Sequence, residues 1–170
     1  MDRMGAFGLD LNLASPVPLA KLVRRMPPSA GASATIRAAL ESLGEIHPTP
    51  LMVAAYRNNE RAVRALLQWG ADPSIRVRAR AGLWPKGLAL RETWTALKIA
   101  AVLDAVGPAR ALVSGEAPVY KDVLRLVCLA SSTRVATALL STRSQSLRES
   151  NLLAEDLFYI AVEHESQAII

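Results

Sequence analysis

Hydrophobic residues recur along most of this chain at the spacing of α-helices. The clearest pair of segments lies at 49–57 and 60–69, and each places apolar residues three and four positions apart. Thr49 can cap the first segment, Pro50 suits a first helical position, and Gly70 suits the residue after a helix. Two helices of about two turns each are too small to bury their own apolar faces. The pattern therefore predicts a unit that stacks on copies of itself.

Three later segments repeat this pattern with looser identities. The four copies begin at Thr49, Thr95, Asp122 and Asp156, and we expect each of these residues to cap its first helix. The starts are spaced 46, 27 and 34 residues apart, because the connections vary while the helix spacing within a copy is kept. The predicted helix pairs are 50–57/60–69, 95–103/107–114, 122–130/133–141 and 156–163 onward. Two rows are expected to be buried: Leu51, Leu97, Leu124 and Phe158, and Leu66, Leu112 and Leu139.

The first copy resembles the ankyrin repeat. The matching positions are Thr49-Pro50-Leu51, Ala54-Ala55, Val63, Leu66-Leu67 and Gly70-Ala71-Asp72. Met52 stands where the family usually has His, and Asn58 stands where it usually has Gly, although Asn tolerates the same left-handed backbone. The resemblance covers about 49–170. It implies an all-α, ankyrin-type solenoid of about four helix-pair repeats that binds a protein partner and has no catalytic activity.

A basic insertion, residues 75–94, separates the first two copies. Residues 75–81 alternate apolar and basic side chains, Gly and Pro follow, and 88–91 alternate back, which predicts a β-hairpin-like element. The insertion holds five basic residues and one acidic residue, so it accounts for +4 of the chain's net charge of +5. Three interpretations stay open: a solvated edge whose charges prevent aggregation, a contact for an acidic protein surface, and a weak, salt-sensitive contact for nucleic acid.

The part of the chain before the repeats divides into an arm and a helix. Residues 1–33 contain four prolines and predict an extended Pro-rich arm, in which Leu19–Met26 can form two helical turns after Pro18. Residues 35–43 carry one apolar stripe that Gly44 is expected to end. We expect this segment to be a degenerate capping helix, so the solenoid would comprise residues 34–170.

Composition limits the chemistry that the chain can perform. The 170 residues suit one domain or one short array, and 51% hydrophobic residues with 21% charged residues argue against disorder. One cysteine and two histidines exclude a Cys/His zinc site, and His47 and His164 lie far apart in the chain. Cys128 aligns with Ala55 and Ala101, so we expect a buried thiol. We therefore expect no catalytic residues, no metal and no cofactor.

No charge-free run exceeds eleven residues, which is shorter than the ~20 that a membrane span needs. We expect no membrane span and an intracellular, soluble protein. The predicted partner is another protein, with an acidic surface as one candidate and nucleic acid as the alternative, and the chain is expected to belong to a hetero-complex.

The residues expected to contact the partner lie in exposed positions of the repeats and in the insertion. Trp69 has two interpretations, as an interface anchor or as a residue that packs under the insertion. The full set is Met52, Tyr56, Arg57, Trp69, Arg76, Arg78, Arg80, Trp84, Lys86, Lys98 and Arg125.

Overall fold

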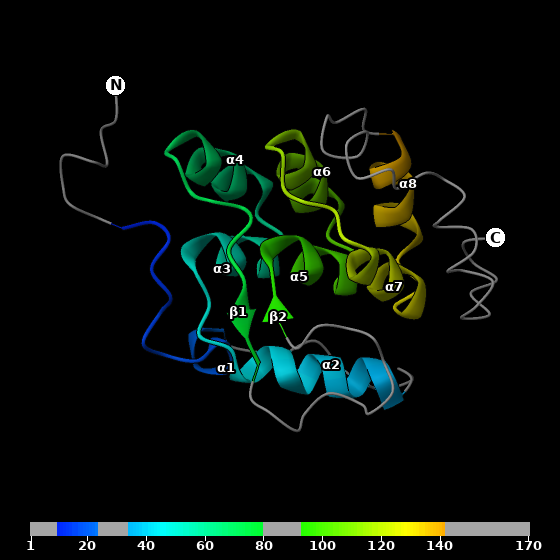
Figure 1. The fold of residues 1–170 in the computed structure, drawn as a ribbon, viewed down its shortest axis with the longest axis horizontal. Helices are drawn as coiled ribbons and strands as arrows, with labels where there is room; N and C mark the ends of the chain where they lie inside the picture. The colour runs from blue at the N-terminus through cyan, green and yellow to red at the C-terminus, as the bar shows by residue number, and fades with distance from the viewer. Residues whose placement is uncertain (1–9, 24–33, 80–92, 142–170) are drawn as a thin grey trace.

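The computed structural model describes residues 10–23, 34–79 and 93–141. Three helix pairs stack side by side in two layers (Figure 1). The inner layer contains α3 (Pro50–Tyr56), α5 (Ala96–Val102) and α7 (Lys121–Leu129), and the outer layer contains α4 (Glu60–Gln68), α6 (Val106–Ser114) and α8 (Thr133–Ser141). The predicted all-α solenoid is confirmed, and its first three pairs have nearly the predicted bounds. The predicted fourth pair, from residue 156, lies outside the described residues.

Hydroxyl caps begin the first two inner helices as predicted. Thr49 Oγ1 accepts a hydrogen bond from the Met52 backbone N–H at 3.4 Å, and Thr95 Oγ1 accepts one from the Lys98 N–H at 3.2 Å. The third copy differs, because α7 begins at Lys121 and the residue before it, Tyr120, makes no side-chain cap. The prediction that Asp122 caps this helix is therefore wrong, since Asp122 lies within its first turn.

The turns between inner and outer helices have the same backbone conformation in all three pairs. Asn58, Asp104 and Ser131 occupy equivalent positions, with φ of 51°, 49° and 50°. This left-handed region is open to Gly and, at lower cost than to most residues, to Asn and Asp. Asn58 therefore takes the place of the family's usual Gly in the conformation that the sequence predicts.

The buried rows largely follow the prediction. Leu51, Leu97 and Leu124 are buried in the inner layer, and Leu112 and Leu139 are buried in the outer layer. Leu66 is only partly buried, and it belongs to the first helix pair, which among the described helices has a neighbouring pair on one side only. Phe158 lies outside the described residues.

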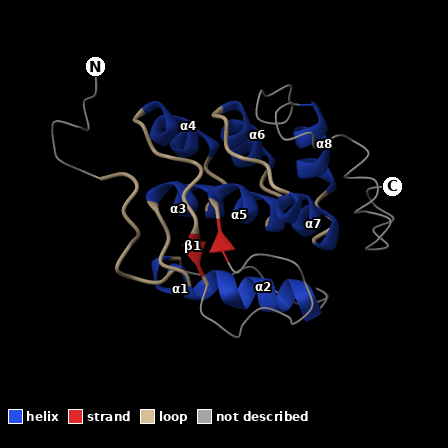
Figure 2. Cartoon of the chain, viewed as in Figure 1, coloured by secondary structure: helices blue, strands red, loops and turns tan. Residues whose placement is uncertain are grey.

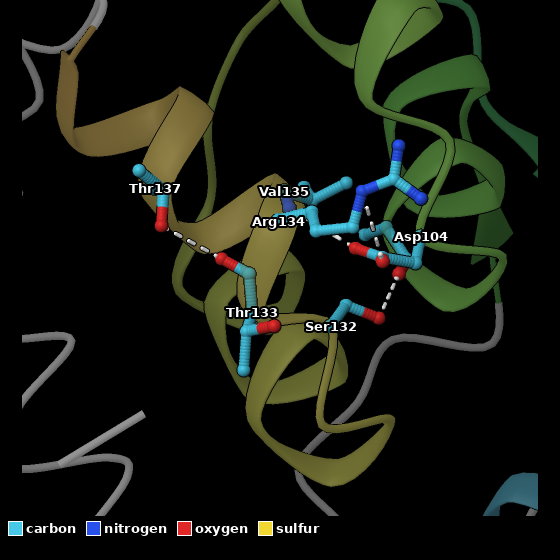
Figure 3. A network of polar contacts seen from close by, with 7 residues as sticks. Asp104, Ser132, Thr133, Arg134, Val135 and Thr137 are labelled. Carbon is cyan, nitrogen blue, oxygen red and sulfur yellow. Dashed lines mark hydrogen bonds and ion pairs between the residues drawn. The ribbon is translucent and has the colours of Figure 1, made fainter. Parts of the chain in front are cut away.

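Direct side-chain contacts also join successive helix pairs. A Cβ added to Gly107 of α6 would lie 2.6 Å from Glu60 Oε2 of α4, so Gly permits this close approach. Between the second and third pairs, the Ser132 hydroxyl donates to the Ala101 carbonyl at 2.7 Å, and Asp104 Oδ1 accepts from the Val135 N–H at 3.0 Å (Figure 3). The pairs are thus held in register by packing and by polar contacts.

A two-stranded ribbon lies at the base of the insertion (Figure 2). Strands β1 (Val77–Arg78) and β2 (Thr93–Trp94) pair antiparallel, with Val77 opposite Trp94 and Arg78 opposite Thr93. The outgoing strand agrees with the predicted alternation from residue 75. The predicted return strand at 88–91 lies outside the described residues, and the described return strand falls directly before the cap of α5.

Two further helices precede the array. α1 (Leu19–Leu22) is a single turn that follows Pro18, and α2 (Ala34–Glu45) is longer. Gly44 does not end α2, which continues to Glu45. The capping-helix prediction is also wrong: instead of stacking at an end of the array, α2 lies lengthwise along it (Figure 1). It lies on the side of the inner layer opposite the outer helices, below the β1–β2 ribbon.

Candidate protein-binding surface

The inner face is the side of α3, α5 and α7 that faces the ribbon and α2. Met52, Lys98 and Arg125 occupy the same position in successive inner helices, and all three were predicted to be exposed. Met52 and Lys98 are only 1% exposed, whereas Arg125 is partly exposed. The prediction of exposure is therefore wrong for the first two, because both side chains lie within the packed interior.

Lys98 is buried because its charge has partners. Its Nζ donates to the Thr93 carbonyl at 2.7 Å and forms an ion pair with the Asp122 carboxylate at 2.5 Å. This pair joins β2, α5 and α7. Asp122 is 8% exposed, and its second oxygen, Oδ1, has no hydrogen-bond partner among the described residues. A buried carboxylate in this state depends strongly on the lysine for its stability.

The middle of α2 contacts the ribbon on the inner face. The Trp94 indole N–H donates to the Ser42 hydroxyl at 3.1 Å, and the Trp94 side chain is fully buried. Ala39 and Leu43 of α2 and Ile46 after it are also fully buried, and they belong to the same hydrophobic core as the inner helices. The inner face is thus covered in this region by residues of the chain itself.

The segment 10–23 lies against the first helix pair. The Arg57 guanidinium donates to the Leu22 carbonyl at 3.1 Å, and the Asp72 N–H donates to Asn12 Oδ1 at 2.8 Å. His47 Nδ1 lies 2.9 Å from the Ser15 carbonyl, to which it donates in the Nδ1–H tautomer. Arg57, predicted to meet a partner, is exposed but already holds this segment.

The other predicted contact residues of the first repeat differ in exposure. Trp69, directly after α4, is 40% exposed. Tyr56 is half-buried, and burial raises the pKa of its phenol above the usual value.

Two of the predicted arginines are exposed on β1 and the residue before it. Arg76 places its guanidinium 4.3 Å from the centre of the Tyr120 ring, a cation–π contact that links the ribbon to the start of α7. Arg78 is exposed at the edge of the ribbon. Arg80, Trp84 and Lys86 lie outside the described residues.

Cys128 shows the inert environment that its alignment with two alanines predicts. It is buried in α7, and burial raises the pKa of its thiol to about 11. At neutral pH this side chain is therefore a thiol and not the nucleophilic thiolate. Among the described residues, no group of three or more His, Cys, Asp or Glu side chains could hold a metal ion. No described helix combines the length and apolar character that a membrane span requires.

Sequence reasoning missed Ser42 and Trp94 on the inner face, and it missed the pairing of Lys98 with Asp122. Ser42 carries a detectable signal, because it is a polar residue on the apolar side of α2, three residues after Ala39 and four before Ile46. Trp94 directly precedes the Thr95 cap, which places it at the entry to α5. The ion pair of Lys98 and Asp122 has no local signal, since the two residues belong to different repeats.

The comparisons with known proteins agree with the arrangement of the first helix pair. The family model of the ankyrin repeat matches residues 49–78, which contain α3, α4 and β1. No curated protein and no solved structure matches the chain.

Proposed function

We propose that this ankyrin-repeat protein is a non-catalytic interaction module that serves as an adaptor or as a subunit of a larger assembly. Ankyrin repeats are generally protein–protein interaction modules. The observation that carries the proposal is the set of exposed Arg and Trp side chains held by the rigid stack. Arg76, Arg78 and Trp69 project from elements whose positions the stacked repeats fix. Arg and Trp are the side chains that most often dominate binding energy at protein interfaces.

The charge of the ribbon supports an acidic protein surface as the partner. Arg78 has no described hydrogen bond or ion pair, and the sequence of the insertion continues with Arg80 and Lys86. Arginine binds carboxylates with two parallel hydrogen bonds, so a row of arginines suits Asp and Glu side chains of a partner. Nucleic acid remains the alternative partner because phosphates attract the same row.

Charge reversal in the insertion tests this proposal. The variant with Arg76→Glu, Arg78→Glu and Arg80→Glu is immobilised beside the wild type, and the proteins retained from a native lysate are compared. We expect the variant to lose the proteins that the wild type retains, while its melting temperature falls only slightly. Exposed charges contribute only about 0–1 kcal/mol to stability, and an exposed cation–π contact, such as that of Arg76 with Tyr120, contributes about 0.5–1 kcal/mol.

The matched control reverses two exposed arginines of the outer helices, Arg61→Glu and Arg110→Glu. This control should retain the same proteins as the wild type. Equal retention by the ribbon variant and the wild type would contradict the proposed role of the arginines. Loss of retention after nuclease treatment of the lysate would assign the ribbon to nucleic acid.

A further inference from the structure

We propose that the inner face binds an amphipathic helix, that α2 occupies this site in cis, and that the partner helix competes with α2 for it. This inference rests on the proposed interaction function and adds the class of partner and the way in which binding is controlled. It starts from the position of α2, which covers the side of the inner helices that faces the ribbon (Figure 1).

α2 and the residue after it have the residue pattern of a helix docked on an apolar surface. Ile36, Ala39, Leu40, Leu43 and Ile46 recur three and four residues apart and are all buried. The charged residues of the same helix, Arg37, Glu41 and Glu45, are exposed. Recognition of an amphipathic helix by a protein surface uses this spacing of anchor residues.

One polar contact lies within the apolar interface and adds selectivity. The fully buried Trp94 indole N–H requires an acceptor, and the Ser42 hydroxyl supplies it at 3.1 Å. A helix that replaces α2 must offer an acceptor at the same place to keep this hydrogen bond. The preferred partner helix therefore carries a small hydroxyl residue on its apolar side, between two large aliphatic anchors.

The backbone of α2 packs less closely against the array than the repeats pack against one another. Adjacent inner helices pack closely against each other, as do adjacent outer helices, whereas the backbone of α2 packs closely only against α1 among the described helices. α2 therefore meets the array mainly through its side chains. The bond of the Ser132 hydroxyl to the Ala101 carbonyl, which joins two repeats, involves no residue of α2.

The side-chain hydrogen bonds between the N-terminal segment and the first repeat lie at the surface, whereas Leu19 of α1 is fully buried in the core. The bonds of Arg57 to Leu22 and of Asp72 to Asn12 are exposed to solvent. Such bonds exchange readily with water and contribute little net stability. Opening the inner face therefore requires that the buried side chains of α2, and Leu19 of α1 that packs with it, leave the core. A competing helix with the same pattern of anchor residues offsets the loss of the α2 contacts.

Peptide exchange on the full-length chain tests the inference without knowledge of the natural partner. The probe is a fluorescein-labelled peptide with the sequence of residues 34–46, and its binding is followed by fluorescence anisotropy. In the wild type, α2 occupies the site in most molecules. The apparent affinity for the peptide is therefore lowered in proportion to the fraction of molecules in which the site is open. Leu43→Asp places a charge at a fully buried position of α2 and should open the site.

We expect the Leu43→Asp chain to bind the peptide at least about 10-fold more tightly than the wild type, because its open fraction is larger. Ser42→Ala, which removes only the acceptor for Trp94, should give a smaller increase. Glu41→Lys is the matched control, since it changes the charge of the same helix on its exposed side. It should bind the peptide as weakly as the wild type.

Three results would overturn the inference. The first is a Leu43→Asp chain that keeps its helical circular dichroism and cooperative melting but binds the peptide no better than the wild type. The second is a Leu43→Asp chain that no longer folds, together with a Ser42→Ala chain that folds and shows no gain, because α2 would then be a fixed part of the core. The third is equal binding of a scrambled peptide. None of them affects the capture test of the ribbon arginines, so the two proposals can fail separately.

Discussion

At the scale of single residues, the buried charges of Lys98 and Asp122 form a contact between the second and third repeats in which each charge depends on the other. Lys98 occupies the position that Met52 fills in the first repeat, so one repeat places an apolar side chain where the next places an ammonium group. Removing two charges from water costs several kcal/mol each, and the attraction between them offsets this cost only while both are present.

The first prediction follows from this dependence. Lys98→Met installs the side chain of the first repeat and leaves the Asp122 carboxylate buried without its cation. We expect the free energy of unfolding, measured by urea denaturation, to fall by about 3–5 kcal/mol, as for other broken buried pairs.

The double variant Lys98→Met/Asp122→Leu is the matched comparison, because it removes both charges and leaves apolar side chains. We expect it to be more stable than Lys98→Met alone, which gives a favourable coupling energy in a double-mutant cycle. Additive losses in the cycle would show that the two charges do not depend on each other.

At the scale of elements, the helices could be predicted from the sequence because local interactions determine where they begin and end. Thr49 and Thr95 carry their own capping hydroxyls, and the apolar periodicity identifies the buried side of each helix. The start of α7 was predicted less well because Asp122 is a good capping residue whose carboxylate instead pairs with Lys98 of another repeat. A tertiary contact there outweighs the local preference.

The candidate site could be predicted only where exposure follows from local position. Arg76 and Arg78 lie in an alternating segment outside the stack, and both are exposed as expected. Met52 and Lys98 were misassigned because their burial depends on contacts between elements that no local pattern records. The lengthwise position of α2 has the same origin: its stripe predicts an amphipathic helix but not the surface against which that helix packs.

The second prediction concerns the start of α8. The Val135 N–H lies in the first turn, where helical amides have no partner within the helix, and Asp104 of the preceding repeat supplies the acceptor (Figure 3). Asp104→Gly removes this acceptor but tolerates the φ of 49°. We expect it to lower stability by about 0.5–2 kcal/mol, as the loss of a helix cap does. Hydrogen exchange should become faster in the first turn of α8.

Asp104→Asn is the control for this prediction, because it keeps an oxygen acceptor and also tolerates the left-handed backbone. It loses only the attraction to Arg134, whose Nε lies 3.9 Å away on an exposed side chain, and such pairs contribute little. The Asn variant should therefore resemble the wild type in both measurements. Equal losses in the Gly and Asn variants would contradict the capping role.

At the scale of the whole molecule, stability arises from contacts between neighbouring repeats. α6 packs against both α4 and α8, whereas α4 has a described outer-helix neighbour only in α6. In such an array each interface between neighbouring repeats contributes separately to the free energy of unfolding. A core residue of a central repeat therefore supports two interfaces, whereas a core residue of an end repeat supports one.

Leu112 and Leu66 test this view because they occupy the same position in successive outer helices. Leu112 is fully buried in α6, and Leu66 is only partly buried in α4. Leu112→Ala should lower the free energy of unfolding by about 2–5 kcal/mol, the range for a leucine truncated in a closely packed core. Leu66→Ala leaves a cavity that water can partly fill, so we expect its cost to be smaller by about 1 kcal/mol or more. Both costs are measured from urea denaturation curves with a common slope. Equal costs would mean that Leu66 is as closely packed as Leu112. This result would contradict the view that α4 lies at an end of the array.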